Sequence, residues 1–171
     1  MVLRSIKKTF DEVKRETQKA EVAALNRSVT SALGHTIRFI REGYNLKAKD
    51  IRSQTKIIKA NHNKPTVELR VNEKAIGLIM FRAHQTRKGV TAAQRKGKRH
   101  RYQHAFIANS KKGGQRVFIR RTEQPLPIKE LFGPSAMQLF SSKAAQKTLE
   151  DKFYERFNIE LKRAIDFFVN K

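Results

Sequence analysis

The sequence is poor in side chains arranged for catalysis. It contains no cysteine, no P-loop and no G-x-S-x-G motif, so a thiol nucleophile and two common motif-marked active sites are absent. The acidic residues lie mostly at helical spacing from Lys or Arg, as in "EDKFYERFNIELKR", where solvent-side ion pairs are the expected role. His100 and His104 are four residues apart and could share a helix face, but no third metal ligand stands nearby. We therefore predict no catalytic residue, no metal site, no cofactor and no enzymatic activity.

The side chains that bind anions are abundant instead. The segment "TRKGVTAAQRKGKRHRY", Thr86 to Tyr102, holds seven basic residues and no acid, and no Asp or Glu occurs from Lys74 to Thr122. The whole chain carries 38 Lys and Arg against 15 Asp and Glu, a formal net charge of +23. Nucleic acid is the default partner for such a charge. A hydrophobic content of 39% with eleven Phe indicates that the charge is carried by a folded protein.

We predict that the basic segment and the strand after it form one cationic patch. In "QRVFIRRT", strand alternation projects Arg116 and Arg120 from one face with Phe118 between them. Such a patch would neutralise phosphates and lose affinity steeply with salt. Motifs that read base sequence are absent, so contacts to the backbone and shape of the nucleic acid are expected. The alternative is a solvated, mobile loop. The candidate nucleic-acid-facing residues are Arg87, Lys88, Arg95, Lys96, Lys98, Arg99, Arg101, Arg116, Arg120 and Arg121.

The elements that must position these residues indicate an α+β fold in one domain, 1–171. Apolar residues at helical spacing predict a long helix over 5–42, and a short helix follows with Asn45 as a possible N-cap. Alternating residues predict a small antiparallel sheet of three to four strands over 66–122, with a "KKGG" hairpin and a long basic loop at 84–103. A C-terminal helix is predicted over 143–169.

Two apolar segments point to assembly with other subunits. The stretch 123–140 contains Pro125, Pro127 and Pro134, which lack an amide donor, so it is expected to be a turn-rich arm rather than a central strand. Its apolar side chains need a covering surface, and so do the consecutive apolar residues that end the last helix. The candidate assembly-interface residues are Leu126, Ile128, Leu131, Phe132, Phe167, Phe168 and Val169.

No part of the sequence predicts a membrane or secretory role. No run approaches the roughly 18 apolar residues of a membrane span, and the charged N-terminus lacks an apolar signal core. The absence of cysteine favours a reducing compartment. We therefore expect a protein that is soluble or part of a soluble assembly.

The arm "RRTEQPLPIKELFGPSAMQLF", with its Arg-Arg-Thr, Leu-Pro-Ile and Gly-Pro-Ser elements, resembles the prophage minor tail protein Z family, the tail completion proteins of lambda-like tailed phages. The helix "VAALNRSVTSAL" is similar to that family's "A-x-N-R" helix. "NLKAKDIRSQTKIIKAN" is similar to its basic second segment, and the order of strand, basic loop, "AFIAN" and "RVFIRRT" follows its layout. The resemblance covers about Ala20 to Phe140.

The resemblance implies a structural protein of the virion. It would act at the head-proximal end of the tail, after assembly in the host cytoplasm, and complete the tail for joining to the filled head. Its partners would be other tail and neck proteins, its subunit fold tail-terminator-like, and its assembly a homo-oligomeric ring, guessed as six-fold. The basic loop would face double-stranded phage DNA inside the ring without sequence specificity, or else grip acidic surfaces of neighbouring tail proteins. The alternative function is a non-sequence-specific nucleic-acid-binding protein, either ribosome-associated or nucleoid-associated.

Overall fold

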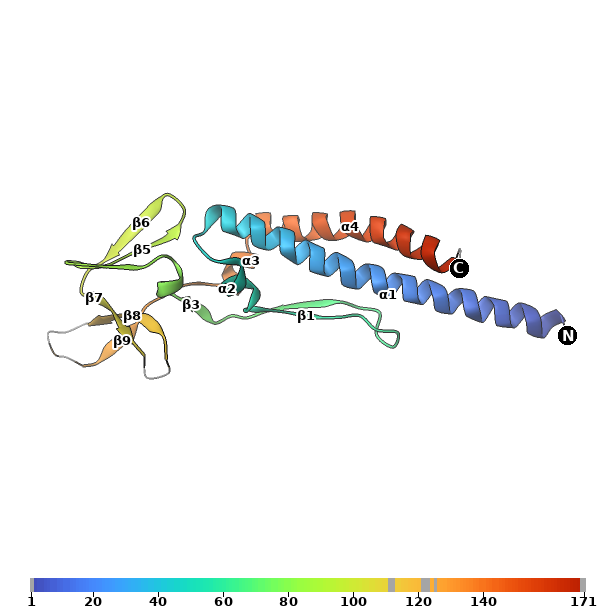
Figure 1. The fold of residues 1–171 in the computed structure, drawn as a ribbon, viewed down its shortest axis with the longest axis horizontal. Helices are drawn as coiled ribbons and strands as arrows, with labels where there is room; N and C mark the ends of the chain where they lie inside the picture. The colour runs from blue at the N-terminus through green and yellow to red at the C-terminus, as the bar shows by residue number, and fades with distance from the viewer. Residues whose placement is uncertain (1, 111–112, 121–123, 125, 170–171) are drawn as a thin grey trace. The chain divides into compact units, whose positions relative to one another are not determined.

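The computed structural model describes residues 2–110, 113–120, 124 and 126–169, and within these ranges it describes side chains from residue 12 to residue 167. The predicted α+β class, with a long first helix, small antiparallel sheets and a C-terminal helix, is confirmed (Figure 1). The single domain predicted from the length stays a prediction. The elements are α1 (Val2–Gly43), α2 (Ala48–Arg52), β1 (Thr55–Ile58), β2 (Glu68–Val71), β3 (Ala75–Gly77), a 3₁₀ helix (Leu78–Met80), β4 (His84–Thr86), β5 (Gly89–Arg95), β6 (Lys98–Tyr102), β7 (Ala105–Asn109), β8 (Gln115–Arg120), β9 (Ile128–Glu130), β10 (Phe132–Ser135), α3 (Ala136–Phe140) and α4 (Lys143–Val169).

The contacts divide the chain into two compact units. The helical unit comprises 1–36, 56–70 and 146–171, which hold most of α1, the β1–β2 hairpin and most of α4. The sheet unit comprises 37–55 and 71–145, which hold the remaining strands. Each unit has its own buried side chains, so each is described by itself.

The helical unit is organised by a row of small side chains on α1. From Ala20 to Thr36 every fourth residue is completely buried. Residues at this spacing lie along one ridge of the helix, and their small side chains permit close packing. The buried hydroxyls of Ser28 and Thr36 donate to the carbonyls of Ala24 and Ala32, at 2.6 and 2.9 Å, so their burial leaves no donor unsatisfied. The residues of this row are Ala20, Ala24, Ser28, Ala32 and Thr36.

Two adjacent polar residues of α1 connect this helix to the β1–β2 loop and to α4 within the helical unit. The Asn26 amide donates to the carbonyl of Ala60 at 3.0 Å and accepts from its amide at 2.8 Å, which fixes the β1–β2 loop. The Arg27 guanidinium lies 3.0 Å from a carboxylate oxygen of Glu160 on α4. Within this unit α1 and α4 run antiparallel and side by side (Figure 1). The Asn-Arg pair noted in the sequence therefore has a structural role.

Glu160 differs from the solvent-side ion pairs predicted for the acids of α4. Its side chain is 3% exposed and lies 2.5 Å from Arg156 and 3.6 Å from Arg163, in addition to Arg27. The hydrogen bond from Arg27 is the largest cause that holds the pKa of Glu160 below its ordinary value, and the charges of the neighbouring arginines add to it. The sequence contains a signal for the burial of Glu160, because this residue lies three residues after Phe157 and four before the buried Ala164, at spacings that share one helix face.

The sheet unit packs around a small apolar core. Leu78, Phe81, Val90 and Val117 are at most 1% exposed. The strands form the sheets β4–β5–β6, β7–β8–β9 and β3–β10, and each pairing that the structure describes within them is antiparallel. The 3₁₀ helix contacts β5, β8 and β10, so it joins all three sheets.

The structure differs from the predicted basic loop at 84–103, which is a three-stranded sheet. Strand β5 is buried from Gly89 to Ala93, so this segment contributes core residues as well as charge. Gly97 adopts φ 74° in the turn between β5 and β6, a conformation that favours glycine. The basic side chains therefore stand on strands and in tight turns rather than on a long loop.

The structure also differs from the predicted arm at 123–140, because most of the segment that the structure describes is paired. Strand β9 pairs with β8, strand β10 pairs with β3, and Ser135 and Gln138 form a capping box at the start of α3. Both strands are edge strands, and Pro134 lies in β10, as expected for a residue without an amide donor.

Two smaller predictions have different outcomes. The predicted hairpin between β7 and β8 is confirmed, with Gly113 and Gly114 at φ 85° and 77°, while Lys111 and Lys112 of "KKGG" lie outside the described residues. Asn45 as an N-cap is wrong, because Lys47 occupies that position without a side-chain cap. The Asn45 amide instead donates to the carbonyls of Ala93 and Arg95 at 2.9 and 3.3 Å, which ties the end of α1 to β5.

Candidate nucleic-acid interface

The structure separates the run of basic residues on β6 between two faces. Lys98, His100 and Tyr102 line one cavity. Arg99 points the other way, where its guanidinium lies 3.5 Å from the hydroxyl of Thr91, the register partner of Arg101. Alternation along the strand is the cause, since neighbouring side chains leave a strand on opposite faces. The single patch predicted from the sequence is thus divided into groups.

The first group of predicted residues meets at a cavity of about 690 Å³, which we call the arginine cavity. Arg87 and Lys88 come from the turn between β4 and β5, and Arg120 comes from the end of β8. The Arg120 guanidinium lies 4.9 Å from the centre of the Phe106 ring. No acidic residue lines this cavity among the described residues, so three cations converge on it without a counter-charge.

A glutamine holds the turn of the arginine cavity in place. The Gln85 side-chain amide donates to the carbonyls of Thr86 and Gly89, each at 3.2 Å, and its oxygen accepts from the Ile107 amide at 2.8 Å. These bonds join the β4–β5 turn to β7. Arg87 and Lys88 therefore stand on a braced turn.

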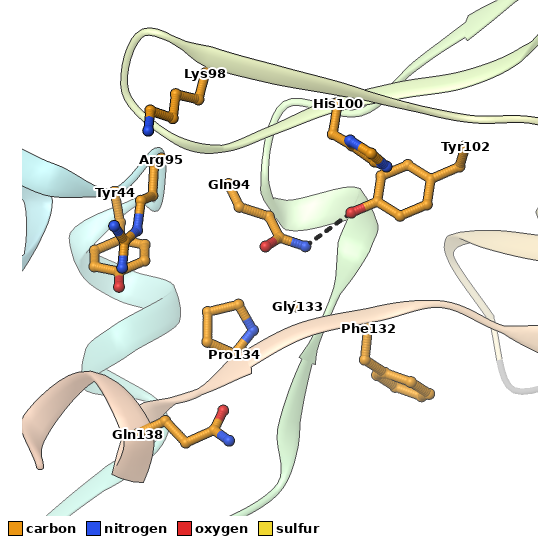
Figure 2. A pocket seen from close by; sticks show the side chains of 10 residues that line it. All are labelled: Tyr44, Gln94, Arg95, Lys98, His100, Tyr102, Phe132, Gly133, Pro134 and Gln138. Atoms are coloured by element: carbon orange, nitrogen blue, oxygen red, sulfur yellow. Dashed lines mark hydrogen bonds between the residues drawn. The ribbon is translucent and has the colours of Figure 1, made fainter.

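The second group lies at a cavity of about 590 Å³, which we call the aromatic cavity (Figure 2). Arg95 lies above the Tyr44 ring, 5.6 Å from its centre. Lys98 extends from β6 on the same side of the view. Both cations were predicted from the sequence, whereas Tyr44, at the end of α1, was not.

Tyr102 and His100 form one wall of the aromatic cavity. Their ring centres lie 4.8 Å apart in an edge-to-face arrangement. The Tyr102 hydroxyl accepts a hydrogen bond from the Gln94 amide at 3.0 Å, as drawn in Figure 2. Burial raises the pKa of Tyr102 above its ordinary value of 10.0, so the hydroxyl keeps its proton at neutral pH. The ring is therefore fixed and its hydroxyl can still donate.

Strand β10 forms the opposite wall. Phe132, Gly133 and Pro134 follow one another along it, with Gln138 of α3 close by (Figure 2). A side chain at Gly133 would overlap the buried Phe81 ring, so β10 lies directly on the core. The Phe132 side chain is 48% exposed. No carboxylate lines this cavity among the residues that the structure describes.

The remaining predicted basic residues do not join either cavity. Arg99 and Arg101 stand on the other face of β6, and Lys96 is exposed in the β5–β6 turn. Arg116 lies 2.8 Å from Glu130 of β9, so its charge is balanced within the sheet. Arg121 lies outside the described residues. Arg116 and Arg120 share one face of β8 as predicted, yet cross-strand pairing gives them different surroundings.

The candidate interface residues also divide. Leu126 is 68% exposed, and Ile128 and Phe132 are exposed in the same unit. Leu131 is half-buried, and its backbone bonds to Val117 and Leu78 at 2.8 and 3.0 Å, which gives it a role within the sheet unit. In the helical unit Phe167 is 62% exposed. The side chains of Phe168 and Val169 lie outside those that the structure describes.

No group of metal ligands accompanies these cavities in the described residues. His100 lies in β6 and His104 in the following turn at φ 58°, so they do not share the helix face considered for a metal site. Their surroundings are cationic.

A protein family model matches nearly the whole chain. The family model described as prophage minor tail protein Z (GPZ) matches residues 4–170. The chain belongs to the prophage minor tail protein Z family. The resemblance inferred from the sequence is confirmed, and the match reaches further than the span from Ala20 to Phe140. No curated protein and no solved structure matches the chain.

Membership in the minor tail protein Z family indicates a bacteriophage minor tail protein, located in the virion tail and associated with other tail proteins. It favours the tail protein over the ribosome-associated or nucleoid-associated alternative. Among the described residues, no helix is long and apolar enough to cross a membrane. The family match assigns no role to a single residue, so the basic and apolar candidates stay predictions.

Proposed function

We propose that the protein is a tail completion protein, which acts at the head-proximal end of the tail and prepares it for joining to the filled head. Its role is structural rather than enzymatic. The observation that carries this proposal is membership in the minor tail protein Z family over residues 4–170. The proposal further includes a homo-oligomeric ring, six-fold as the working stoichiometry, whose sheet units face DNA.

The distribution of charge supports a DNA-facing sheet unit. This unit holds 21 Lys and Arg against 5 Asp and Glu, a net of +16, whereas the helical unit holds 17 against 10, a net of +7. A protein that lines the path of DNA needs phosphate contacts without base readout. The arginine cavity, with Arg87, Lys88 and Arg120, offers such contacts. A ring would repeat this site around the duplex.

Exposed apolar side chains support assembly with neighbours. Leu126 and Ile128 are exposed beside β9 in the sheet unit, and Phe167 is exposed near the end of α4. Exposed apolar side chains that lie together, as Leu126 and Ile128 do in the sequence, can mark a contact with another subunit. We assign them to contacts with other copies or with other tail and neck proteins.

Deletion of the gene from the phage that encodes it tests the function. We expect filled heads and tails to accumulate separately, and wild-type protein supplied from a plasmid to restore joined particles. Electron microscopy and plaque counts measure the outcome. Joined, infectious particles at the undeleted level would overturn the proposal.

Charge substitutions examine the DNA-facing surface in the same complementation assay. The variant with Gln at Arg87, Lys88 and Arg120 is expected to reduce the number of infectious particles at least tenfold. A matched control removes the same charge from α4 with Gln at Lys147, Lys152 and Lys162, and should complement normally. Equal complementation by the two variants would remove the role of the arginine cavity and leave tail completion in place.

The ring is tested on the tail itself. Cryo-electron microscopy of purified tails should show the protein as a closed ring at the head-proximal end. A single copy there, or its presence elsewhere along the tail, would contradict this part of the proposal.

A further inference from the structure

The aromatic cavity has chemistry that a duplex-facing surface does not need. In a DNA duplex the bases are stacked inside and the phosphates lie on the outside. A cationic surface is therefore sufficient to bind a duplex. The aromatic cavity adds ring side chains to two cations and has room for a small organic group. Rings beside cations are the combination with which proteins bind single-stranded nucleic acid.

We propose that the aromatic cavity binds an unpaired nucleotide of DNA, with the base stacked on Phe132 or Tyr102 and the phosphate held by Lys98 and Arg95. This inference rests on the proposed function, in which the sheet unit faces DNA, and adds a ligand class to it. An unpaired nucleotide occurs at a frayed or single-stranded DNA end.

The rings are positioned for this role by their own contacts. Tyr102 is fixed by the Gln94 hydrogen bond and by His100 against its edge, so it loses little freedom when a base binds. Phe132 stands on the opposite wall and is 48% exposed. The two walls come from β6 and β10, and the cavity between them is about 590 Å³. In the view of Figure 2 the Phe132 ring extends from β10 away from Tyr102, so a base would stack on one of the two rings rather than between them.

The charges around the rings select an anionic ligand. Arg95 lies over Tyr44, which restricts its guanidinium to one edge of the cavity, and Lys98 reaches the same cavity from β6. The absence of carboxylates from its described lining leaves these charges available for a phosphate. The Gln94 and Gln138 amides add donors and acceptors of the kind that a base edge uses.

Two neighbouring residues on β6 provide a matched test of the cavity. Lys98→Gln removes one charge inside the aromatic cavity, whereas Arg99→Gln removes one charge from the opposite face of the same strand. Fluorescence anisotropy at low salt would compare a labelled oligothymidine of twelve nucleotides with a duplex of the same length. We expect Lys98→Gln to weaken single-strand binding several-fold more than Arg99→Gln does.

A substitution of an aromatic side chain separates the contribution of base stacking from that of charge. Phe132→Leu keeps the charge and an apolar side chain, so it should weaken oligothymidine binding about tenfold and leave duplex binding unchanged. Its circular dichroism spectrum should match the wild type. Photo-crosslinking of an oligonucleotide with 5-iodouracil, followed by mass spectrometry, should place the crosslink on Phe132 or Tyr102.

The outcomes of these experiments distinguish the nucleotide site from the DNA-facing surface of the sheet unit. Duplex binding with unchanged oligothymidine affinity in Phe132→Leu, or crosslinks outside the cavity, would overturn the nucleotide site and leave the DNA-facing surface intact. Wild-type protein that binds neither probe at low salt would overturn both. Binding of both probes, with loss of the single strand alone in Phe132→Leu, supports the site.

Discussion

The helical unit and the sheet unit are both basic, but they differ in how their charged side chains form ion pairs. In the helical unit, several of the described acids pair with bases: Glu16 with Lys19, Glu155 with Lys152, Glu68 with Lys64 and Arg70, and Glu160 with three arginines. In the sheet unit, Arg116 with Glu130 is the ion pair found in the described residues. On this difference rests our proposal that the sheet unit, rather than the helical unit, meets an external anion.

Secondary structure explains much of this difference. On a helix, residues three or four apart lie side by side, so a sequence that alternates Glu and Lys balances itself within one element. On a strand, neighbouring side chains point to opposite faces, and a partner must come from another strand. The stretch from Lys74 to Thr122 has no acid to supply one. A partner for its cations must come from outside the stretch, as Glu130 does for Arg116.

The largest expected effect tests whether the sheet unit has a core that supports its charged surface. Phe81 is fully buried beneath β10, so Phe81→Ala should lower the free energy of unfolding by about 3–5 kcal/mol. Urea denaturation measures the change. Phe132→Leu, at an exposed ring of the same unit, should change it by less than about 0.5 kcal/mol. A loss below about 1 kcal/mol for Phe81→Ala would show that this core contributes little.

The next effect concerns the apolar face of α4 in the helical unit. Phe157 is half-buried and stacks on Phe153 with ring centres 5.9 Å apart. Phe157→Ala should therefore cost about 2 kcal/mol, below the range for a fully buried Phe. Thermal and urea denaturation measure it. A value near zero would assign this face to assembly rather than to the unit itself.

Glu160 tests the paired charges of the helical unit. Glu160→Gln removes bonds to exposed arginines, so we expect a cost of about 1.5 kcal/mol at neutral pH, as for a hydrogen bond to a charged group. Because the pKa of folded Glu160 lies below its ordinary value of 4.5, the wild type has this stabilisation fully above pH 4.5. The stabilisation is lost as the pH falls through the folded pKa.

Urea denaturation at pH 7 and below pH 4.5 checks this prediction. The difference between wild type and Glu160→Gln should shrink at the lower pH. Glu150→Gln, at an exposed position of the same helix, should stay within about 0.5 kcal/mol throughout. A difference that does not depend on pH would show that the carboxylate charge is not responsible.

The smallest effect tests the unpaired charges of the sheet unit. Arg120→Gln should lower the slope of log affinity for duplex DNA against log salt concentration by about 0.9, the value for one lost phosphate contact. Lys152→Gln, which removes a paired charge on α4, should leave the slope unchanged. Fluorescence anisotropy over a salt series measures both slopes. Equal slopes in the two variants would remove the distinction between the units.

The sequence by itself determined the class of fold, the two long helices and the strongly basic charge. Helical periodicity over more than twenty residues is a local signal, and net charge is a property of composition, so neither depends on long-range contacts. The same holds for the "KKGG" hairpin, because its glycines meet a local backbone requirement. The Arg-Arg-Thr and Gly-Pro-Ser elements of the arm indicated the family.

Only the tertiary structure decided which charges act together. Lys98 and Arg99 are neighbours in the sequence but lie on opposite faces of β6, and Tyr44 contacts Arg95, which lies 51 residues further along the chain. Arg116 is balanced by Glu130, whereas Arg120 has no acidic partner among the described residues, because strand register chooses the partners. Cross-strand pairing brings together residues that no local pattern relates, and for this reason the cavities could not be predicted from the sequence.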